Sequence, residues 1–264
     1  MSAQSKTVGA ASVGPAVGAA SVGSTAAAIS VGTTGGGIRE RARRELTAAI
    51  KALARQQLAT SGADCLSLRA IARELDMASS AIYRYFASRD ELLTALVIDA
   101  YNDLGAAAED ALAASAGQPA MSRWVSVCRA VRTWGLNHQH EYGLIYGTPV
   151  PGYRAPRDTV APAGRAVLAL VEIIVNAHEQ GIARPPNEAV PAAISANMAR
   201  LRNELGIPLI VGDGVMTAMI SMWAGLFGLV SFELFGQFHG IVDVRDDFFD
   251  HSVTRLGRSV GIPD

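Results

Sequence analysis

Residues 66–93 read LSLRAIARELDMASSAIYRYFASRDELL, and this stretch decides the fold of the first part of the chain. Its first half has apolar residues at the three- and four-residue spacing of one helix face, namely Leu68, Ile71, Ala72 and Leu75. Ser67 precedes them as a helix N-cap, and Asp76-Met77 interrupts the pattern. We therefore expect two short helices joined by a tight break. The second runs from about Ala78 to Phe86 and buries Ala81, Ile82 and Phe86.

Further helices flank this pair on both sides. Ser88 and Glu91 have the spacing of a capping box, which predicts a long helix from Ser88 to about Leu104. Upstream, residues 38–61 have a helical stripe that ends at Gly62 and is formed by Leu46, Ile50, Leu53, Ala54 and Leu58. Residues 38–101 therefore predict a helical module that contains a helix-turn-helix, with the motif at about residues 66–85.

The rest of the chain alternates helical patterns with short breaks, and no segment predicts a strand. We expect a break near residues 137–141, an irregular proline-rich connection over residues 148–164, and a long apolar helix over residues 214–232. The fold class is therefore all-α, with an N-terminal three-helix helix-turn-helix domain (38–101) and a larger C-terminal helical domain (102–264). Residues 1–37 are rich in Ala, Gly and Ser, and we expect a disordered tail without a signal peptide.

Charge is segregated along the chain, although the formal net charge is only -1. Residues 38–89 contain ten Lys and Arg against five Asp and Glu, whereas residues 90–264 contain twelve against nineteen. A short basic module before a long acidic one favours a polyanionic partner for the first part alone. Cys65 and Cys128 match no metal or redox spacing, which is typical of isolated thiols in a reducing cytoplasm, so we expect a cytoplasmic protein.

The second helix of the pair is a candidate DNA-reading element, because an α-helix fits the major groove of B-DNA. Small serines would let its N-terminal end approach the DNA closely. Tyr83 would donate to a phosphate, and Arg84 would pair with either a phosphate or a guanine. The expected DNA-contacting residues are Arg39, Arg43, Ser67, Arg69, Ser79, Ser80, Tyr83, Arg84, Tyr85 and Arg89.

The stretch LSLRAIARELDMASSAIYRYFASRDELL resembles the DNA-binding domain of TetR/AcrR-type transcriptional regulators, over roughly residues 40–101. More weakly, TWGLNHQHEYGLIYGTPVPGYRAP and MWAGLFGLVSFELFG resemble the C-terminal domain of the subgroup named after a Trp-His-Gly motif. That motif reads Trp223-Ala224-Gly225 here, so any role of its histidine is not carried over.

This resemblance implies a homodimeric, sequence-specific DNA-binding regulator. It further implies a repressor that is released from a palindromic operator when a small, largely apolar ligand binds the C-terminal domain and tilts the helix that starts at Ser88. Two positions depart from the family pattern. Asp76 replaces the usual Gly of the turn, and Asp tolerates the left-handed conformation. Ala78 replaces the usual Ser or Thr cap, and Ser79 is the alternative cap.

The uncharged helix over residues 214–232 is long enough to span a membrane. Asp213 and Glu233 bound it, and no cationic cluster flanks it. A helix buried within its own domain and against a twofold mate is therefore favoured, and no membrane partner is expected. The expected dimer interface contains Ala224, Gly228, Phe232, Phe249 and Val253.

Polar and aromatic residues on otherwise apolar helices are candidate ligand contacts, although Trp and Met in such positions are more often part of a core. The candidates are Trp124, Trp134, His138, Tyr142, Tyr146, Asn176, Met198, Met222 and Trp223. His138 and His140 are two residues apart and would not share a helix face, so we expect no metal and no cofactor.

Two other classes of protein fit the sequence less well. An enzyme is not expected, because no P-loop, GxSxG, HExxH or dinucleotide glycine motif is present, and His138, Glu141 and Tyr142 lack a partner nucleophile. A structural adaptor that dimerises without DNA would favour an uncharged face on the short helix pair, whereas this face is basic.

Overall fold

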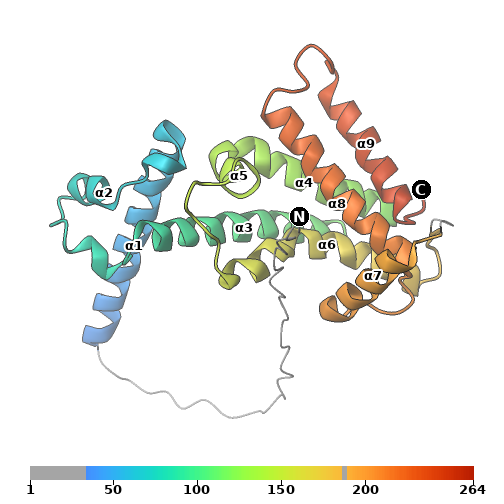
Figure 1. Cartoon of the computed structure of the whole chain (residues 1–264), viewed down its shortest axis with the longest axis horizontal. Helices are drawn as coiled ribbons and strands as arrows, with labels where there is room; N and C mark the ends of the chain where they lie inside the picture. Colours follow the sequence, from blue (N-terminus) through green and yellow to red (C-terminus); the bar gives the residue numbers. More distant parts are fainter. Residues whose placement is uncertain (1–33, 186–188) are drawn as a thin grey trace, which may run out of the picture.

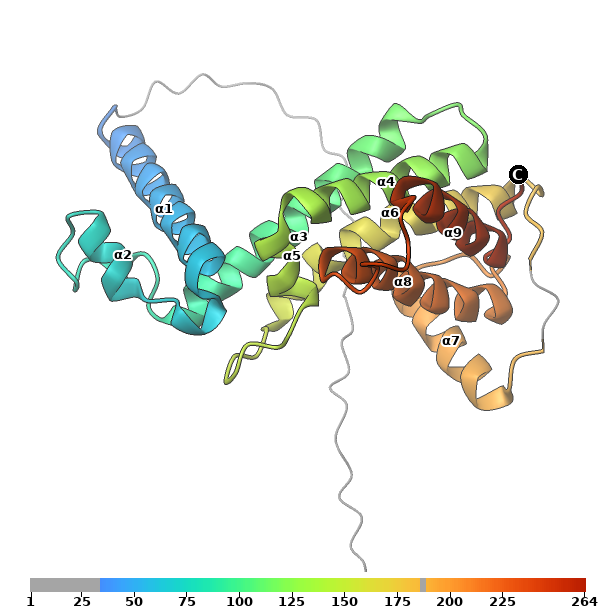
Figure 2. The same cartoon turned by 90° about the horizontal axis from the view of Figure 1, so that it is seen from above.

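The computed structural model describes residues 34–185 and 189–264, and over these ranges it contains helices and no strand, which confirms the all-α expectation. Figures 1 and 2 show a small domain around α1 and α2 standing apart from a larger helical domain. The long helix α3 runs from the first domain into the second (Figure 1). Most of the expected tail lies outside the described residues, and α1 begins at Thr34, four residues earlier than expected.

The N-terminal domain is built from α1 (Thr34–Ser61), η1 (Ala63–Cys65), α2 (Leu68–Glu74), η2 (Ile82–Arg84) and the start of α3 (Arg89–Ala114). One apolar cluster holds these elements together, formed by Ile50, Ala54, Leu58, Leu66, Leu68, Ile71, Ala72, Ile82, Phe86, Leu92, Leu93 and Leu96. The helical stripes of the sequence meet in this cluster, so burial of apolar surface stabilises helices that would be marginal alone.

Two serines cap helix N-termini as expected. The hydroxyl of Ser67 accepts from the amide of Ala70 at 3.3 Å, and that of Ser88 accepts from the amide of Glu91 at 3.1 Å. The Glu91 carboxylate accepts from the amide of Ala87 at 2.7 Å, so the reciprocal bond reaches one residue beyond the expected capping box. Each bond satisfies an N–H group near a helix start, where intrahelical partners are missing.

The segment after the break in the helix pair differs from the expectation. Asp76 has a φ of 52°, which confirms the left-handed turn. The α-helix expected over residues 78–86 is wrong, because this segment forms turns and the single 3-10 turn η2. The amides of residues 81, 84 and 85 bond to carbonyls three residues earlier. Ala78 has no side-chain acceptor that could cap a helix, and no helix starts at Ser79 either. Serines also disfavour helix interiors, so this segment forms a tighter turn instead of an α-helix.

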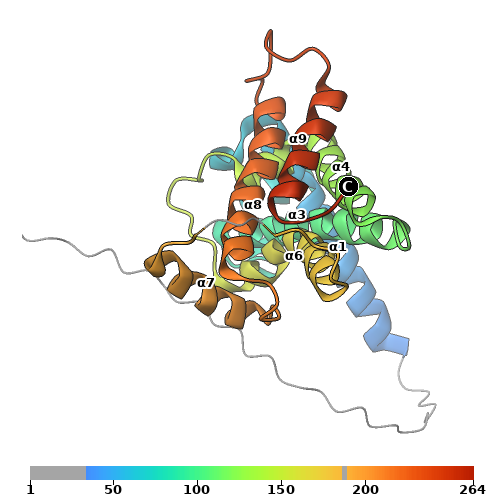
Figure 3. The ribbon, with the colours of Figure 1, turned by 90° about the vertical axis from the view of Figure 1, so that its right-hand side faces the viewer.

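The C-terminal domain is a helical bundle. It contains α4 (Ala120–Asn137), α5 (Gln139–Tyr146), η3 (Arg157–Thr159), α6 (Val160–Glu179), α7 (Ala192–Leu205), α8 (Asp213–Leu234) and α9 (Arg245–Ser259). The break between α4 and α5 at His138 confirms the expectation. The irregular connection is shorter than expected, because η3 and α6 begin before Gly164. Figure 3 shows α8 and α9 side by side, with α7 at the flank.

The residues of the connection between α5 and η3, 148–156, are here called the strap. Val150 and Tyr153 of the strap, together with Leu144 of α5, pack against the apolar cluster of the N-terminal domain. The hydroxyl groups of Tyr153 and Thr94 of α3 are hydrogen-bonded at 2.9 Å. The strap thus belongs to the C-terminal part of the chain and docks on the N-terminal domain.

Helix α8 has one buried face and one exposed apolar face. Met222, Leu226 and Val230 are fully buried, whereas Trp223 and Phe232 are 43% and 53% exposed. One protomer therefore buries only one face of α8, and the expected burial of the other face against a twofold mate stays a prediction. By length and composition alone, α8 and the stretch 157–179 could each cross a membrane, but both supply residues to the core of the helical bundle.

Candidate nucleic-acid interface and regulatory domain

The 3-10 turn η2 displays the residues expected to read DNA. Tyr83 and Arg84 are exposed, and Ser79 and Ser80 are exposed in the turn just before them. Tyr85 is half-buried and packs against the apolar cluster, as do the buried Ile82 and Phe86. The turn therefore holds its apolar side chains inward and leaves a compact surface with hydroxyl and guanidinium groups, which are the groups that bind phosphates and base edges.

Three of the expected DNA contacts have partners within the protein. Ser67 uses its hydroxyl as the cap of α2, and its amide donates to Gln57 at 3.1 Å. Arg89 donates to the carbonyl of Ala63 at 2.7 Å and lies 3.6 Å from a carboxylate oxygen of Asp90. Tyr85 is a packing residue. These contacts position η1 and α2. The three side chains would therefore hold the DNA-binding surface in place rather than contact DNA at its centre.

The cations of the N-terminal domain fall into two groups. Lys51 and Arg55 of α1 donate to the two carboxylate oxygens of Asp99 in α3, at 2.9 and 2.8 Å. They join the two helices and are not free for a polyanion. The remaining Arg residues that are exposed in this domain are Arg39, Arg41, Arg43, Arg44, Arg69, Arg73 and Arg84. Lys51 and Arg55 are four residues apart and therefore lie on one helix face. From the sequence, this spacing could have indicated that the two cations share a partner.

Most of the nine expected ligand contacts lie in the core of the C-terminal domain. Trp124, Trp134, Tyr142, Met198 and Met222 belong to its apolar cluster, and Tyr146 packs against it. The indole N–H of Trp124 donates to the carbonyl of Val253 at 2.8 Å, so this residue fastens α4 to α9. Asn176 is half-buried, and His138 and Trp223 are exposed.

Tyr142 links α5 to α8. Its hydroxyl donates to the carbonyl of Phe227 at 3.0 Å and lies 2.9 Å from the hydroxyl of Ser231. Burial raises the pKa of Tyr142 to about 12, and the hydrogen bond with Ser231 opposes part of this shift. Its phenol is therefore neutral at any physiological pH. Trp134 differs, because its indole N–H is buried and has no hydrogen-bond partner among the described residues.

Comparison with known proteins gives the family of the chain. Residues 50–96 match the family profile described as bacterial regulatory proteins of the tetR family, and residues 124–256 match a tetracyclin repressor-like C-terminal domain. The HTH-type transcriptional regulator Rv1816 of Mycobacterium tuberculosis is 41% identical over 203 residues, which cover 76% of this chain and 86% of that protein. The chain belongs to the TetR family.

Solved structures agree with this assignment. The regulatory protein SCO4313 aligns with a TM-score of 0.67 and 35% identity, over 83% of this chain and 98% of that one. The TetR-family regulator PfmR of Thermus thermophilus shares the fold at a TM-score of 0.52 and 16% identity, over 81% of this chain and 99% of that one. The Trp-His-Gly subgroup is not confirmed by these matches. This TetR-family chain is thus a transcriptional regulator with a helix-turn-helix DNA-binding domain.

The expected dimer surface of this TetR-family chain needs a correction. Phe249 is 2% exposed and Val253 is fully buried within the protomer, so neither is free to contact a mate. They fill the space between α9 and the rest of the bundle, where Trp124 bonds to Val253. Ala224 and Phe232 are exposed on α8, and Gly228 is half-buried on the same helix.

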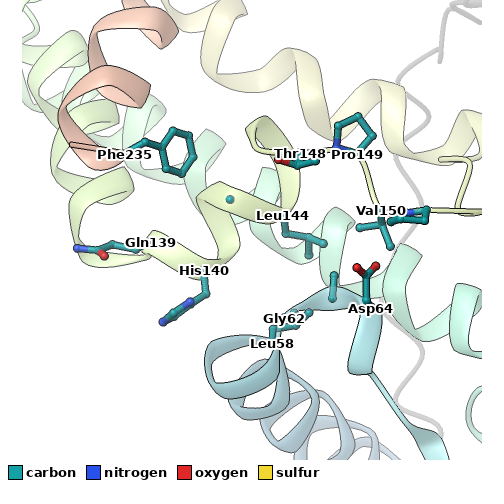
Figure 4. Close-up of a pocket in the computed structure, with 13 residues that line it drawn as sticks. Leu58, Gly62, Asp64, Gln139, His140, Leu144, Thr148, Pro149, Val150 and Phe235 are labelled. Atoms are coloured by element: carbon teal, nitrogen blue, oxygen red, sulfur yellow. The ribbon is translucent and has the colours of Figure 1, made fainter. Parts of the chain in front are cut away.

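Sequence reasoning missed a groove between the two domains, shown in Figure 4. Its volume is about 420 Å³. One wall is the end of α1 with η1, the other is α5 with the strap, and Phe235 lies at the end of α8 (Figure 4). It is lined by Leu58, Gly62, Ala63, Asp64, Gln139, His140, Gly143, Leu144, Thr148, Pro149, Val150, Pro151 and Phe235. None of the nine expected ligand contacts lines it, because its walls come from segments about 80 residues apart, which no local pattern joins.

Proposed function

We propose that this TetR-family regulator is a cytoplasmic homodimeric repressor without catalytic activity, which binds a palindromic operator and is released by a small, largely apolar effector. The observation that supports it best is the surface around η2. There, Ser79, Ser80, Tyr83 and Arg84 are exposed together, while Ile82 is fully buried beneath them. Two such surfaces in a symmetric dimer would contact successive major-groove faces about 34 Å apart.

The dimer in this proposal forms through α8. This helix exposes Ile220, Trp223 and Phe232, and large apolar side chains exposed together on one helix are typical of a protein interface. Ala224 and Gly228 lie four residues apart on it, and their small size would let two backbones approach closely. The mate would cover the apolar face that the protomer leaves open.

The effector site in this proposal uses the C-terminal domain. The buried indole N–H of Trp134, which has no partner among the described residues, is suited to an acceptor atom on a ligand. Its ring stacks on His138 at a centroid distance of 5.1 Å, near the junction of α4 and α5. A ligand that shifts this junction would reach the N-terminal domain through α5, because Leu144 of α5 packs against that domain.

The test is binding to the promoter DNA upstream of the chain's own gene, measured by fluorescence anisotropy at constant salt. Arg84→Ala and Tyr83→Phe should weaken binding, by about 1–3 kcal/mol for Arg84 if it reads a base. Arg258→Ala is the matched control, because Arg258 is an exposed arginine of α9, paired with Asp264 and remote from η2 in sequence. Equal affinity of all four proteins would rule out η2 as the DNA-reading element.

A further inference from the structure

We propose that the groove of Figure 4 is an effector site for a small amphiphilic cation, in which a ring-sized apolar body lies between the two domains and a protonated amine faces Asp64. This site rests on the proposed function, because a ligand bound there would act directly on the placement of the DNA-binding domain. Trp134 is not among the residues that line the groove.

The walls of the groove suit an apolar body. Leu58 of the N-terminal domain, Leu144 of α5 and Val150 of the strap line it, and the ring of Phe235 is 47% exposed. Figure 4 shows Leu144 between Phe235 and Val150, above the N-terminal wall with Leu58, Gly62 and Asp64. A volume of about 420 Å³ is within the range of small-molecule sites and holds a molecule of one or two rings.

Asp64 gives the groove its charge preference. Figure 4 shows its carboxylate pointing from η1 toward the strap. It has no ion pair or hydrogen bond among the described residues, and it is the one acidic residue that lines the groove. Arg89, whose guanidinium reaches η1, is already bonded to the carbonyl of Ala63 and lies beside Asp90. An amine at the groove would therefore meet an uncompensated carboxylate.

Both walls of the groove are fixed to elements that hold the DNA-binding domain in place. On one side, η1 is continuous with α1 and is held by Arg89 at the start of α3. On the other side, the strap packs against the N-terminal core and is bonded to Thr94 through Tyr153. A ligand in the groove touches both sides, so its binding would stabilise one angle between the domains over others.

The test uses the full-length protein and calorimetric titration with tryptamine, 2-phenylethylamine and 1-naphthylmethylamine. The N-acetyl derivative of each amine is the neutral control. Fragments of this size should bind with a Kd of about 0.1–3 mM. The amines should bind about two- to fivefold more tightly than their N-acetyl forms, since an ion pair with the exposed Asp64 contributes about that much.

Two variants locate the site. Asp64→Asn should remove the preference for the amine over its N-acetyl form. Gly143→Phe should abolish binding of both forms, because a Cβ at Gly143 meets nothing within 4 Å and the ring would project into the groove that Gly143 lines. The matched controls are Asp110→Asn on α3 and Gly37→Phe on α1, an exposed carboxylate and an open glycine outside the groove, and both should bind like wild type.

Regulation is measured separately, as promoter affinity with and without the amine. Saturating amine should lower the affinity of the wild type at least about threefold and leave that of Gly143→Phe unchanged. The proposed site would be ruled out if the amine does not bind, or if Asp64→Asn and Gly143→Phe both leave its affinity unchanged. Amine binding with unchanged promoter affinity would overturn its regulatory role. Promoter binding in the absence of amine tests the proposed function on its own, so the two failures are distinguishable.

Discussion

Replacing Gly105 with alanine should force apart α3, the helix that connects the domains, and α6 of the C-terminal domain. Gly105 is buried in α3, and a Cβ there would lie 2.6 Å from the Cβ of Arg165 in α6. Neither atom can rotate away, so the backbones must separate. Overpacking of this kind costs about 1–3 kcal/mol. The higher helix propensity of Ala over Gly offsets about 1 kcal/mol of this cost, so the free energy of unfolding should fall by up to about 2 kcal/mol.

Gly143→Ala is the matched control for this substitution. Gly143 is also helical, but a Cβ there meets nothing within 4 Å, so the same change should stabilise the chain by about 0.5–1 kcal/mol. Thermal unfolding followed by circular dichroism at 222 nm should therefore separate the two variants by at least about 2 °C, with Gly105→Ala lower. Equal melting temperatures would refute the close α3–α6 contact. Promoter affinity should change only in Gly105→Ala, because α3 bears the DNA-binding domain.

Three further predictions concern the C-terminal domain and the cysteines. Arg132→Met should destabilise the chain by about 2–4 kcal/mol in urea denaturation, because Arg132 makes two 2.7 Å hydrogen bonds to Glu233 and both side chains are largely buried. Adding Glu233→Gln to this variant should recover part of the lost stability. If it recovers none, the pairing of Arg132 with Glu233 is contradicted. Burial raises the pKa of the Cys128 thiol, whereas Cys65 is exposed. A disulfide reagent at pH 8 should thus label one thiol per native chain and two after denaturation. At Gly228 an added Cβ meets nothing within 4 Å of the protomer. Gly228→Leu should therefore shift the protein toward monomer in sedimentation, and an unchanged dimer would place the interface elsewhere.

The sequence is a good guide where structure is local. Ser67 and Ser88 predict helix starts because a hydroxyl at that position accepts an amide of the first turn, and both bonds form. Asp76 likewise adopts the left-handed turn expected of it. The same reasoning fails over residues 78–86, where the apolar spacing fits an α-helix but Ala78 supplies no cap. Spacing predicts which residues are buried, whereas capping and propensity decide which helix type forms.

Contacts between distant segments do not follow from local sequence patterns. The resemblance of residues 66–93 to a known family indicates a DNA-binding module, but no local pattern indicates that Tyr153 bonds to Thr94 or that the strap docks on the N-terminal core. The groove between the domains depends on that docking. The interface prediction failed for Phe249 and Val253 for a related reason. An apolar stripe on a helix shows that it packs against something, but does not distinguish its own domain from a mate.

The central claim, that the surface around η2 reads operator DNA as part of a dimer, is tested most directly by the salt dependence of promoter binding. Affinity is measured over a range of salt concentrations for wild type and Arg84→Ala, and log affinity is plotted against log salt. We predict a steep negative slope for wild type and a lower affinity for the variant at every salt concentration, with a slope shallower by about 2 if Arg84 contacts a phosphate in each protomer. A wild-type affinity that does not change with salt, or identical affinities and slopes for the two proteins, would contradict the claim.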